Sequence, residues 1–97
     1  MNMELKLNVY AIYDSKSKQY ENPFYVRMRG EALRMFADET NRPESKIYKH
    51  PEDYTLFELG TYSPDSGRYD SLDTPHSCGV AIEFHEAAKE AHIRALQ

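Results

Sequence analysis

The sequence predicts a small α+β domain with a four-stranded, mainly antiparallel sheet in ββαββα order and helices packed on one face. Three observations predict this class. The 97 residues are enough for one domain with one small core. Two pairs of segments alternate apolar and polar residues, and each pair is followed by a stretch with helical character. No linker or internal repeat divides the chain, so residues 1–97 are expected to form a single domain.

The first half of the chain predicts two strands and a helix. A first strand at residues 5–14 divides its side chains between two faces, with Leu5, Leu7, Val9, Ala11 and Tyr13 on one and Lys6, Asn8, Tyr10 and Ile12 on the other. A polar turn leads to a second strand at residues 24–29, with Phe24, Val26 and Met28 on one face and Tyr25, Arg27 and Arg29 on the other. Gly30 and Glu31 suit a helix start. Pro43 follows its end, and another short helical turn is expected around Ile47.

The second half predicts a hairpin and a final helix. Residues 54–62 suit a third strand, the turn signal at residues 63–67 follows it, and residues 68–72 suit a short fourth strand. Residues 73–77 are polar and are expected to form a loop. Residues 80–96 have no internal Gly or Pro after Gly79 and predict a helix. Its apolar side chains Ile82, Ile93 and Leu96 lie off the thin alanine stripe, so this helix is expected to contact a second surface, such as another subunit.

Charge and composition restrict the function classes. The net charge of −4 argues against simple coating of nucleic acid, but the halves differ. Residues 1–50 carry nine Lys and Arg against seven Asp and Glu, whereas residues 51–97 carry three against nine, so an anionic partner suits only the first half. No segment is long and apolar enough to span a membrane, and residues 1–4 do not begin a secretory signal. The single cysteine excludes an intramolecular disulfide and fits a reducing cytoplasm.

The first hairpin supplies the candidate binding residues. With the register drawn above, one sheet face would combine two tyrosines with basic side chains, and the following turn would extend it; the set is Lys6, Tyr10, Lys16, Lys18, Tyr25, Arg27 and Arg29. Bases stack on tyrosine rings and basic groups attract phosphates, so this chemistry suits single-stranded nucleic acid. An ordinary solvated sheet face explains the same residues. A register shift of one residue would separate them.

The sequence predicts neither an enzyme nor a metal or cofactor site. His76 and Cys78 are close in sequence, but no second Cys/His pair stands at the spacing of a zinc site, and no third group completes a nucleophilic triad. His85 and His92 lack the i, i+4 spacing of a helical metal pair. The four glycines are scattered and form no phosphate-binding loop.

Several segments carry a resemblance to a known family. They are LKLNVYAIYD at residues 5–14, GEALRMFAD at 30–38, NRPES at 41–45, YKHPEDY at 48–54 and LGTY at 59–62. In this order they resemble the small nonstructural protein of gokushovirus-type microviruses, phages with circular single-stranded DNA. The resemblance covers roughly residues 3–72 and leaves the role of residues 74–97 open. It implies a nonstructural protein of the bacterial host cytoplasm, associated with genome replication or packaging and often described as DNA-binding, with no catalytic motif.

Two functions follow. The first is a dimeric module that holds single-stranded DNA without sequence preference, with Lys6, Arg27 and Arg29 at phosphates and Tyr10 and Tyr25 stacked on bases. The second is an interaction protein that never touches DNA. It would bind a phage replication protein, a capsid protein or a host replication factor through its tyrosine-rich surface and its last helix.

Overall fold

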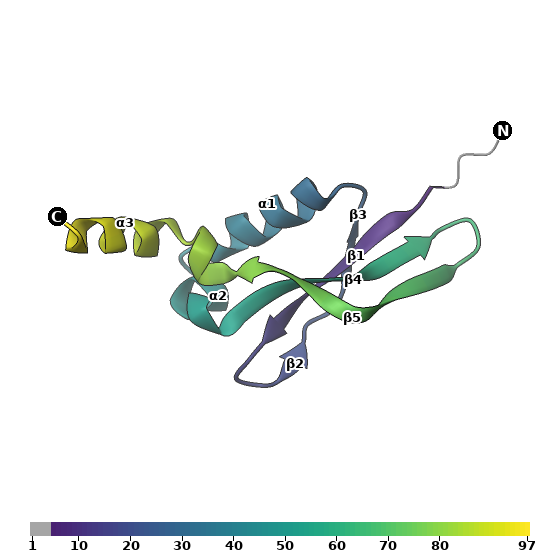
Figure 1. Ribbon diagram of the computed structural model, residues 1–97, viewed down its shortest axis with the longest axis horizontal. Helices are drawn as coiled ribbons and strands as arrows, with labels where there is room; N and C mark the ends of the chain where they lie inside the picture. The colour runs from purple at the N-terminus through teal and green to yellow at the C-terminus, as the bar shows by residue number, and fades with distance from the viewer. Residues whose placement is uncertain (1–4) are drawn as a thin grey trace.

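An antiparallel sheet runs through the middle of the protein, and helices lie along it and beyond one end (Figure 1). The computed structural model describes residues 5–97; residues 1–4, where no secretory signal is expected, lie outside the described residues. The described elements extend over 58 × 30 × 24 Å. Among these residues, no helix is long and apolar enough to cross a membrane.

Strand β1 (Leu7–Asp14) occupies an inner position of the sheet. Along one side it pairs with β4 (Tyr54–Ser63), which pairs in turn with the edge strand β5 (Arg68–Val80). Along its other side it pairs with two short strands, β2 (Gln19–Tyr20) and β3 (Phe24–Val26). All four pairings are antiparallel, so the predicted sheet type is confirmed, but the sheet has five strands rather than four.

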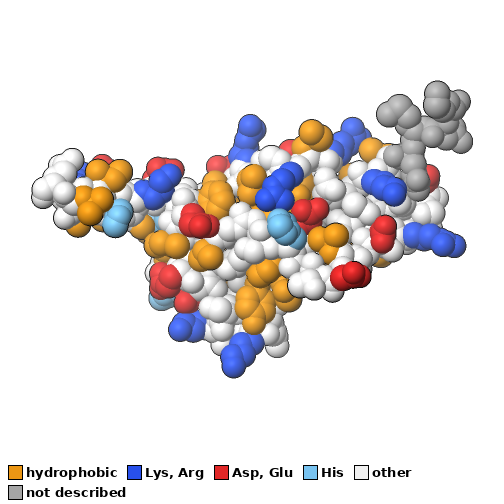
Figure 2. All heavy atoms as spheres, viewed as in Figure 1, with side chains coloured by type: hydrophobic (Ala, Val, Ile, Leu, Met, Phe, Trp, Pro, Cys, Tyr) orange, Lys and Arg blue, Asp and Glu red, His pale blue; other side chains and the backbone are white. Residues whose placement is uncertain are grey.

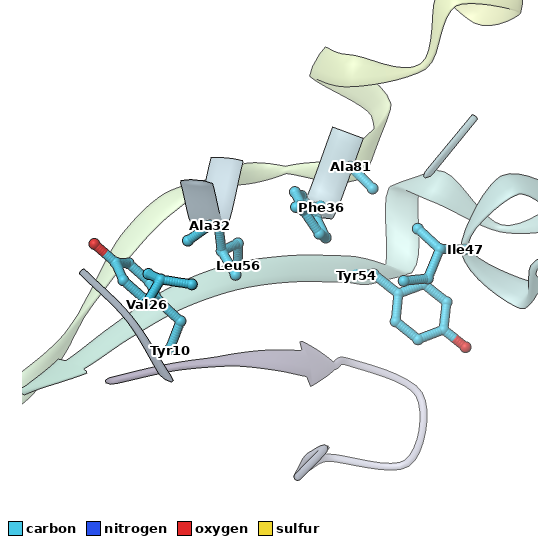
Figure 3. Close-up of a cluster of buried hydrophobic side chains, with 8 residues drawn as sticks. All are labelled: Tyr10, Val26, Ala32, Phe36, Ile47, Tyr54, Leu56 and Ala81. Carbon is cyan, nitrogen blue, oxygen red and sulfur yellow. The ribbon is translucent and has the colours of Figure 1, made fainter. Parts of the chain in front are cut away.

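The helical segments are α1 (Arg29–Thr40), α2 (Lys46–Lys49) and α3 (Glu86–Ala95), with two 3-10 turns, η1 (Pro51–Asp53) and η2 (Ala81–Phe84). A buried cluster joins the sheet to these segments (Figure 3); it consists of Tyr10, Val26, Ala32, Phe36, Ile47, Tyr54, Leu56 and Ala81. Phe36 of α1 and Leu56 of β4 are at most 1% exposed. The core therefore lies between one face of the sheet and the segments α1, α2 and η2.

The helices cover the face of β1 that carries Tyr10 and Ile12, which the sequence pattern predicts to be an exposed binding face. Tyr10 is 1% exposed, and Ile12 packs against the same cluster. The predicted alternation along β1 is therefore confirmed, but Tyr10 and Ile12 belong to the helix-covered side. A tyrosine ring can be buried when its hydroxyl stays near polar groups, and here those groups are Arg29 and Glu58. Burial, followed by the charge of Glu58, raises the pKa of the Tyr10 hydroxyl.

The predicted second strand ends early. It was expected over residues 24–29, but β3 stops at Val26 because α1 begins at Arg29. The Glu31 side chain accepts a hydrogen bond from the Met28 backbone N–H (3.1 Å), which satisfies a donor at the helix start. Two residues of β2 also pair with the end of β1, where the sequence predicted only a turn.

The last two elements also differ from the prediction. The loop expected at residues 73–77 belongs to β5, whose polar residues and Pro75 are tolerated because an edge strand needs hydrogen bonds on one side only. The pairing of β5 with β4 shifts between Glu58 and Gly60, where Ser71 and His76 are the flanking partners. The helix expected at residues 80–96 is divided at His85 into η2 and α3.

Candidate functional site

Aromatic side chains gather on the second face of the sheet. Among residues 5–97, the segments of the buried cluster pack on the Tyr10 side, so the opposite face carries the alternate residues of β1, including Val9 and Tyr13. We call this opposite face the open face. It gathers two groups of three rings, one at each end of the paired region.

The first ring group consists of Tyr13, Tyr20 and Phe57. Tyr13 pairs with Tyr20 across β1 and β2, and their ring centroids lie 4.8 Å apart. Phe57 of β4 approaches both rings, with centroid distances of 6.1 Å to Tyr13 and 5.6 Å to Tyr20. Such edge-to-face contacts favour a fixed arrangement of the three rings. Tyr20 remains 44% exposed, so part of this group faces solvent.

The second ring group consists of Tyr25, Tyr62 and Tyr69. Tyr62 and Tyr69 are paired across the β4–β5 hairpin with centroids 4.8 Å apart, and Tyr25 of β3 lies 5.6 Å from Tyr62. The hydroxyls of Tyr25 and Tyr69 share a hydrogen bond of 2.6 Å. That hydrogen bond raises the pKa of the Tyr69 hydroxyl. Tyr69 is nevertheless 60% exposed, so its ring is accessible.

A shallow hollow of about 250 Å³ opens beside the second ring group. Residues from the β1–β3 region and from the β4–β5 hairpin line this hollow. They are Val9, Pro23, Tyr25, Leu59, Gly60, Thr61, Tyr69, Asp70 and Ser71. Gly60 lies opposite Val9 on one side and Ser71 on the other. An added Cβ at Gly60 would meet the Asp70 carbonyl oxygen at 2.2 Å, so a side chain there would not fit without moving β5.

Basic side chains border the open face. Lys16 and Lys18 lie in the exposed turn between β1 and β2, where Lys18 adopts a left-handed backbone conformation (φ 60°). In Figure 2, Lys and Arg side chains project at the bottom of the view, where Figure 1 has this turn, and hydrophobic side chains lie directly above them. Arg27 follows β3 and is exposed. Within residues 5–97, none of these three side chains forms an ion pair.

The predicted site is only partly assembled. Tyr10 cannot stack on a base, because it is buried and its ring packs against Phe24 with centroids 6.1 Å apart. The predicted pairing of Tyr10 with Tyr25 on one face is wrong, since Tyr10 lies opposite Phe24 and Tyr25 lies opposite Val9. This is the one-residue shift that exchanges the two faces of a strand.

The remaining predicted residues are distributed around the sheet. Arg29 starts α1 and pairs with Glu58 (Nη1–Oε1 3.3 Å) near the hydroxyl of Tyr10, so it belongs to the helix-covered side. Lys6 precedes β1 and is exposed. Tyr25, Arg27, Lys16 and Lys18 stay near the open face.

Five rings of the open face were not among the predicted site residues. Tyr13 and Tyr20 lie on either side of the first turn. Phe57, Tyr62 and Tyr69 come from the β4–β5 hairpin, which joins the first hairpin only through the long-range pairing of β1 with β4. Alternation within residues 54–62 would put Phe57 and Tyr62 on opposite faces, since they are five residues apart. The irregular pairing between Glu58 and Gly60 brings them to the same face. Neither that irregularity nor the register between the two hairpins has a local signal in the sequence.

Cys78 has none of the features of an activated nucleophile. Its side chain is half-buried against the core, and burial raises the pKa of the thiol. Its thiol points to the backbone carbonyl oxygen of His76 (3.7 Å), whereas a reactive cysteine is activated by a neighbouring base or positive charge.

One group of possible metal ligands was not predicted. Ligand atoms of His50, Glu52 and Asp53 lie within 4.8 Å of one another. The 3-10 turn η1 brings these neighbouring residues together, and the first two are exposed. Local chain geometry therefore accounts for the group.

Comparison with known proteins identifies one family. The family described as Phage ORF5 protein matches residues 7–84, which include every strand, α1, α2 and η2 but not α3. The match extends 12 residues beyond Leu72, where the resemblance seen in the sequence ended. No curated protein matches the chain, and no solved structure does. Because the match covers most of its length, the chain belongs to the Phage ORF5 protein family.

Proposed function

We propose that this phage protein is a nonstructural, non-catalytic module that binds single-stranded DNA through the open face, without sequence preference. The observation that carries the proposal is the pair of ring groups on this face, Tyr13, Tyr20 and Phe57 at one end and Tyr25, Tyr62 and Tyr69 at the other. Every base has a flat face, so aromatic platforms bind single strands regardless of sequence. The resemblance to gokushovirus proteins supports a role in the replication or packaging of a single-stranded genome.

The electrostatics favour a path along the open face. Lys16 and Lys18 would meet phosphates at the Tyr20 end, and Arg27 would meet them near Tyr25. The hollow beside Tyr25 and Tyr69 offers room for one base with its edge toward polar groups. Because the whole chain carries a charge of −4, affinity is expected to be modest and to fall steeply with salt.

The first test concerns the rings. Tyr20→Ala and Tyr69→Ala should each weaken binding to labelled oligo-dT by about 1–3 kcal/mol, the usual contribution of one stacked base. Fluorescence anisotropy at low and physiological salt measures this, with duplex DNA of equal length as the weaker ligand. Met35→Ala is the control, because this side chain is 48% exposed on α1, on the far side of the sheet.

The second test concerns the phosphate contacts. The variant Lys16→Ala/Lys18→Ala should weaken binding and lower the slope of log affinity against log salt by about 0.7 for each contact removed. The variant Arg34→Ala/Lys49→Ala removes the same charge from exposed helical positions and should keep the slope of the original protein.

The outcome separates the two functions. Equal effects of the two double variants would mean that binding follows net charge and not the open face. Absence of binding to oligo-dT even at low salt would contradict the proposal and assign the rings to a protein partner, such as a phage replication or capsid protein or a host replication factor. The same aromatic residues suit a protein interface.

A further inference from the structure

Helix α3 projects from the end of the molecule away from the start of β1 (Figure 1), and none of its ten residues is buried. A helix of this length is marginal by itself in water. Its base is nevertheless held firmly. The Asn41 side chain donates to the Phe84 carbonyl (2.9 Å) and accepts from the Glu86 backbone N–H (2.9 Å), so it joins the end of α1 to the start of α3.

His85 fixes the same junction from the other side. It is 6% exposed, its Nδ1 accepts from the Ala88 backbone N–H (3.0 Å), and its Nε2 donates to the Tyr48 carbonyl (3.0 Å). The Tyr48 ring lies 4.6 Å from the imidazole. These contacts satisfy helix-start donors and set the direction of α3, although none of the residues of this helix is buried.

The helix held in this way presents an apolar stripe. A groove of about 570 Å³ between η2 and α3 is lined by Ile82, Glu83, Ala88, Lys89, His92 and Ile93. Leu96 follows His92 by four residues and therefore continues the same stripe. Ile93 and Leu96 are 55% and 73% exposed, and Figure 2 shows hydrophobic side chains along the projecting arm.

Charge along the stripe identifies the partner that fits it. Glu83 and Glu86 lie at or just before the start of α3, whereas His92 and Arg94 lie in its last turn. Lys89 lies between these two groups and pairs with Glu86 of its own helix (3.8 Å). A second identical helix in the opposite direction sets acidic positions against basic ones, and it also opposes the two helix dipoles. A second helix in the same direction sets like charges together.

We propose that α3 is a homodimer contact, in which the helix of a second copy lies antiparallel along the stripe and its Leu96 enters the groove beside Ile82. The contact is isologous, since each copy supplies one groove and one helix end. It buries the exposed Ile93 and Leu96 of both copies. Helix α3 lies outside residues 7–84, whereas Ile82 of the groove lies inside them, so the contact joins an added helix to the family fold without altering the open face.

Sedimentation velocity of the full-length protein from micromolar to millimolar concentration tests the contact. A concentration-dependent dimer is expected, and Ile93→Glu should raise its dissociation constant roughly a hundredfold, because two buried isoleucines are lost. Ala91→Glu adds the same charge at an exposed position off the stripe and should leave the dimer in place. A monomer at every concentration, or equal effects of the two variants, would overturn the proposal and leave the stripe to a different protein.

Cysteine crosslinking tests the orientation. In a Cys78→Ser background, an equimolar mixture of the Ile82→Cys and Leu96→Cys proteins should form the mixed disulfide dimer. Neither protein alone should crosslink efficiently, because the antiparallel register separates identical positions. Efficient crosslinking of Leu96→Cys with itself would indicate parallel helices and overturn the proposed arrangement.

Discussion

Replacing Phe36 with alanine is expected to lower the free energy of unfolding by about 3–5 kcal/mol, the largest effect of any single substitution considered for this fold. Phe36 is 1% exposed and lies between α1 and the sheet (Figure 3). Its ring also meets Phe84 of η2 edge to face, with centroids 5.4 Å apart. The substitution therefore leaves a cavity where the helix, the sheet and the segment after β5 meet.

Urea unfolding followed by circular dichroism measures this loss. Met35→Ala serves as the matched control, since Met35 is the adjacent residue on α1 and is 48% exposed. Its effect should stay within about 0.5 kcal/mol. Similar losses in the two variants would contradict the assignment of Phe36 to the core, because they would reflect only the change in helix propensity.

The sequence predicts the elements better than it predicts their faces. Alternation along β1 separates Tyr10 and Ile12 from Val9 and Tyr13, and the structure keeps this separation. Both sets are apolar enough to be buried, so local pattern alone does not determine which set meets α1. Which set of side chains meets α1 depends on the side of the sheet to which the chain crosses after β3, and this is set by tertiary structure.

The errors near the end of the chain have a similar origin. Residues 73–77 have the composition of a loop and yet belong to β5. Only His76 and Ser77 of this segment have partners on β4, and the residues between Ser71 and His76 form an irregularity at the edge of the sheet, where the outer side needs no hydrogen bonds. The division of the last helix at His85 depends on contacts from Asn41 and Tyr48, which are far away in sequence. The helix propensity of residues 80–96 therefore cannot reveal the break at His85.

The candidate site follows the same rule. Tyr25, Arg27, Lys16 and Lys18 could be proposed from the sequence because they are local to one hairpin. Their neighbours on the open face, above all Tyr69, arrive through two successive strand pairings. The sequence therefore predicts that one sheet face combines aromatic and basic side chains. Which residues make up that face depends on the register of the whole sheet.

Gly60→Ala is expected to lower the free energy of unfolding by about 2–4 kcal/mol, from backbone strain and overpacking together. Gly60 has φ +152°, a conformation that side-chain-bearing residues rarely adopt, and its added Cβ would lie 2.2 Å from the Asp70 carbonyl oxygen. Because the obstacle is backbone of the paired strand β5, relief requires the two strands to separate locally. Thermal and urea unfolding both measure the effect.

Gly30→Ala is the matched control for the same chemical change. No heavy atom lies within 4 Å of a Cβ built at Gly30, which is the second residue of α1. Alanine there should raise stability by up to about 1 kcal/mol, since glycine is the poorer helix former. Opposite signs for the two variants would show that the close approach of β4 and β5 is required. Equal small effects would mean that Gly60 does not constrain the hairpin.

The Gly60 variant also links stability to the proposed site. Gly60 lines the hollow beside Tyr25 and Tyr69, and Asp70 directly follows Tyr69 on β5. Displacement of β5 should therefore misalign the second ring group and weaken oligo-dT binding even at temperatures where the variant remains folded. Gly30→Ala, which lies on α1, should bind as the original protein does. Unchanged binding by a folded Gly60→Ala variant would exclude the second ring group from the DNA path and leave the proposal dependent on Tyr13, Tyr20 and Phe57.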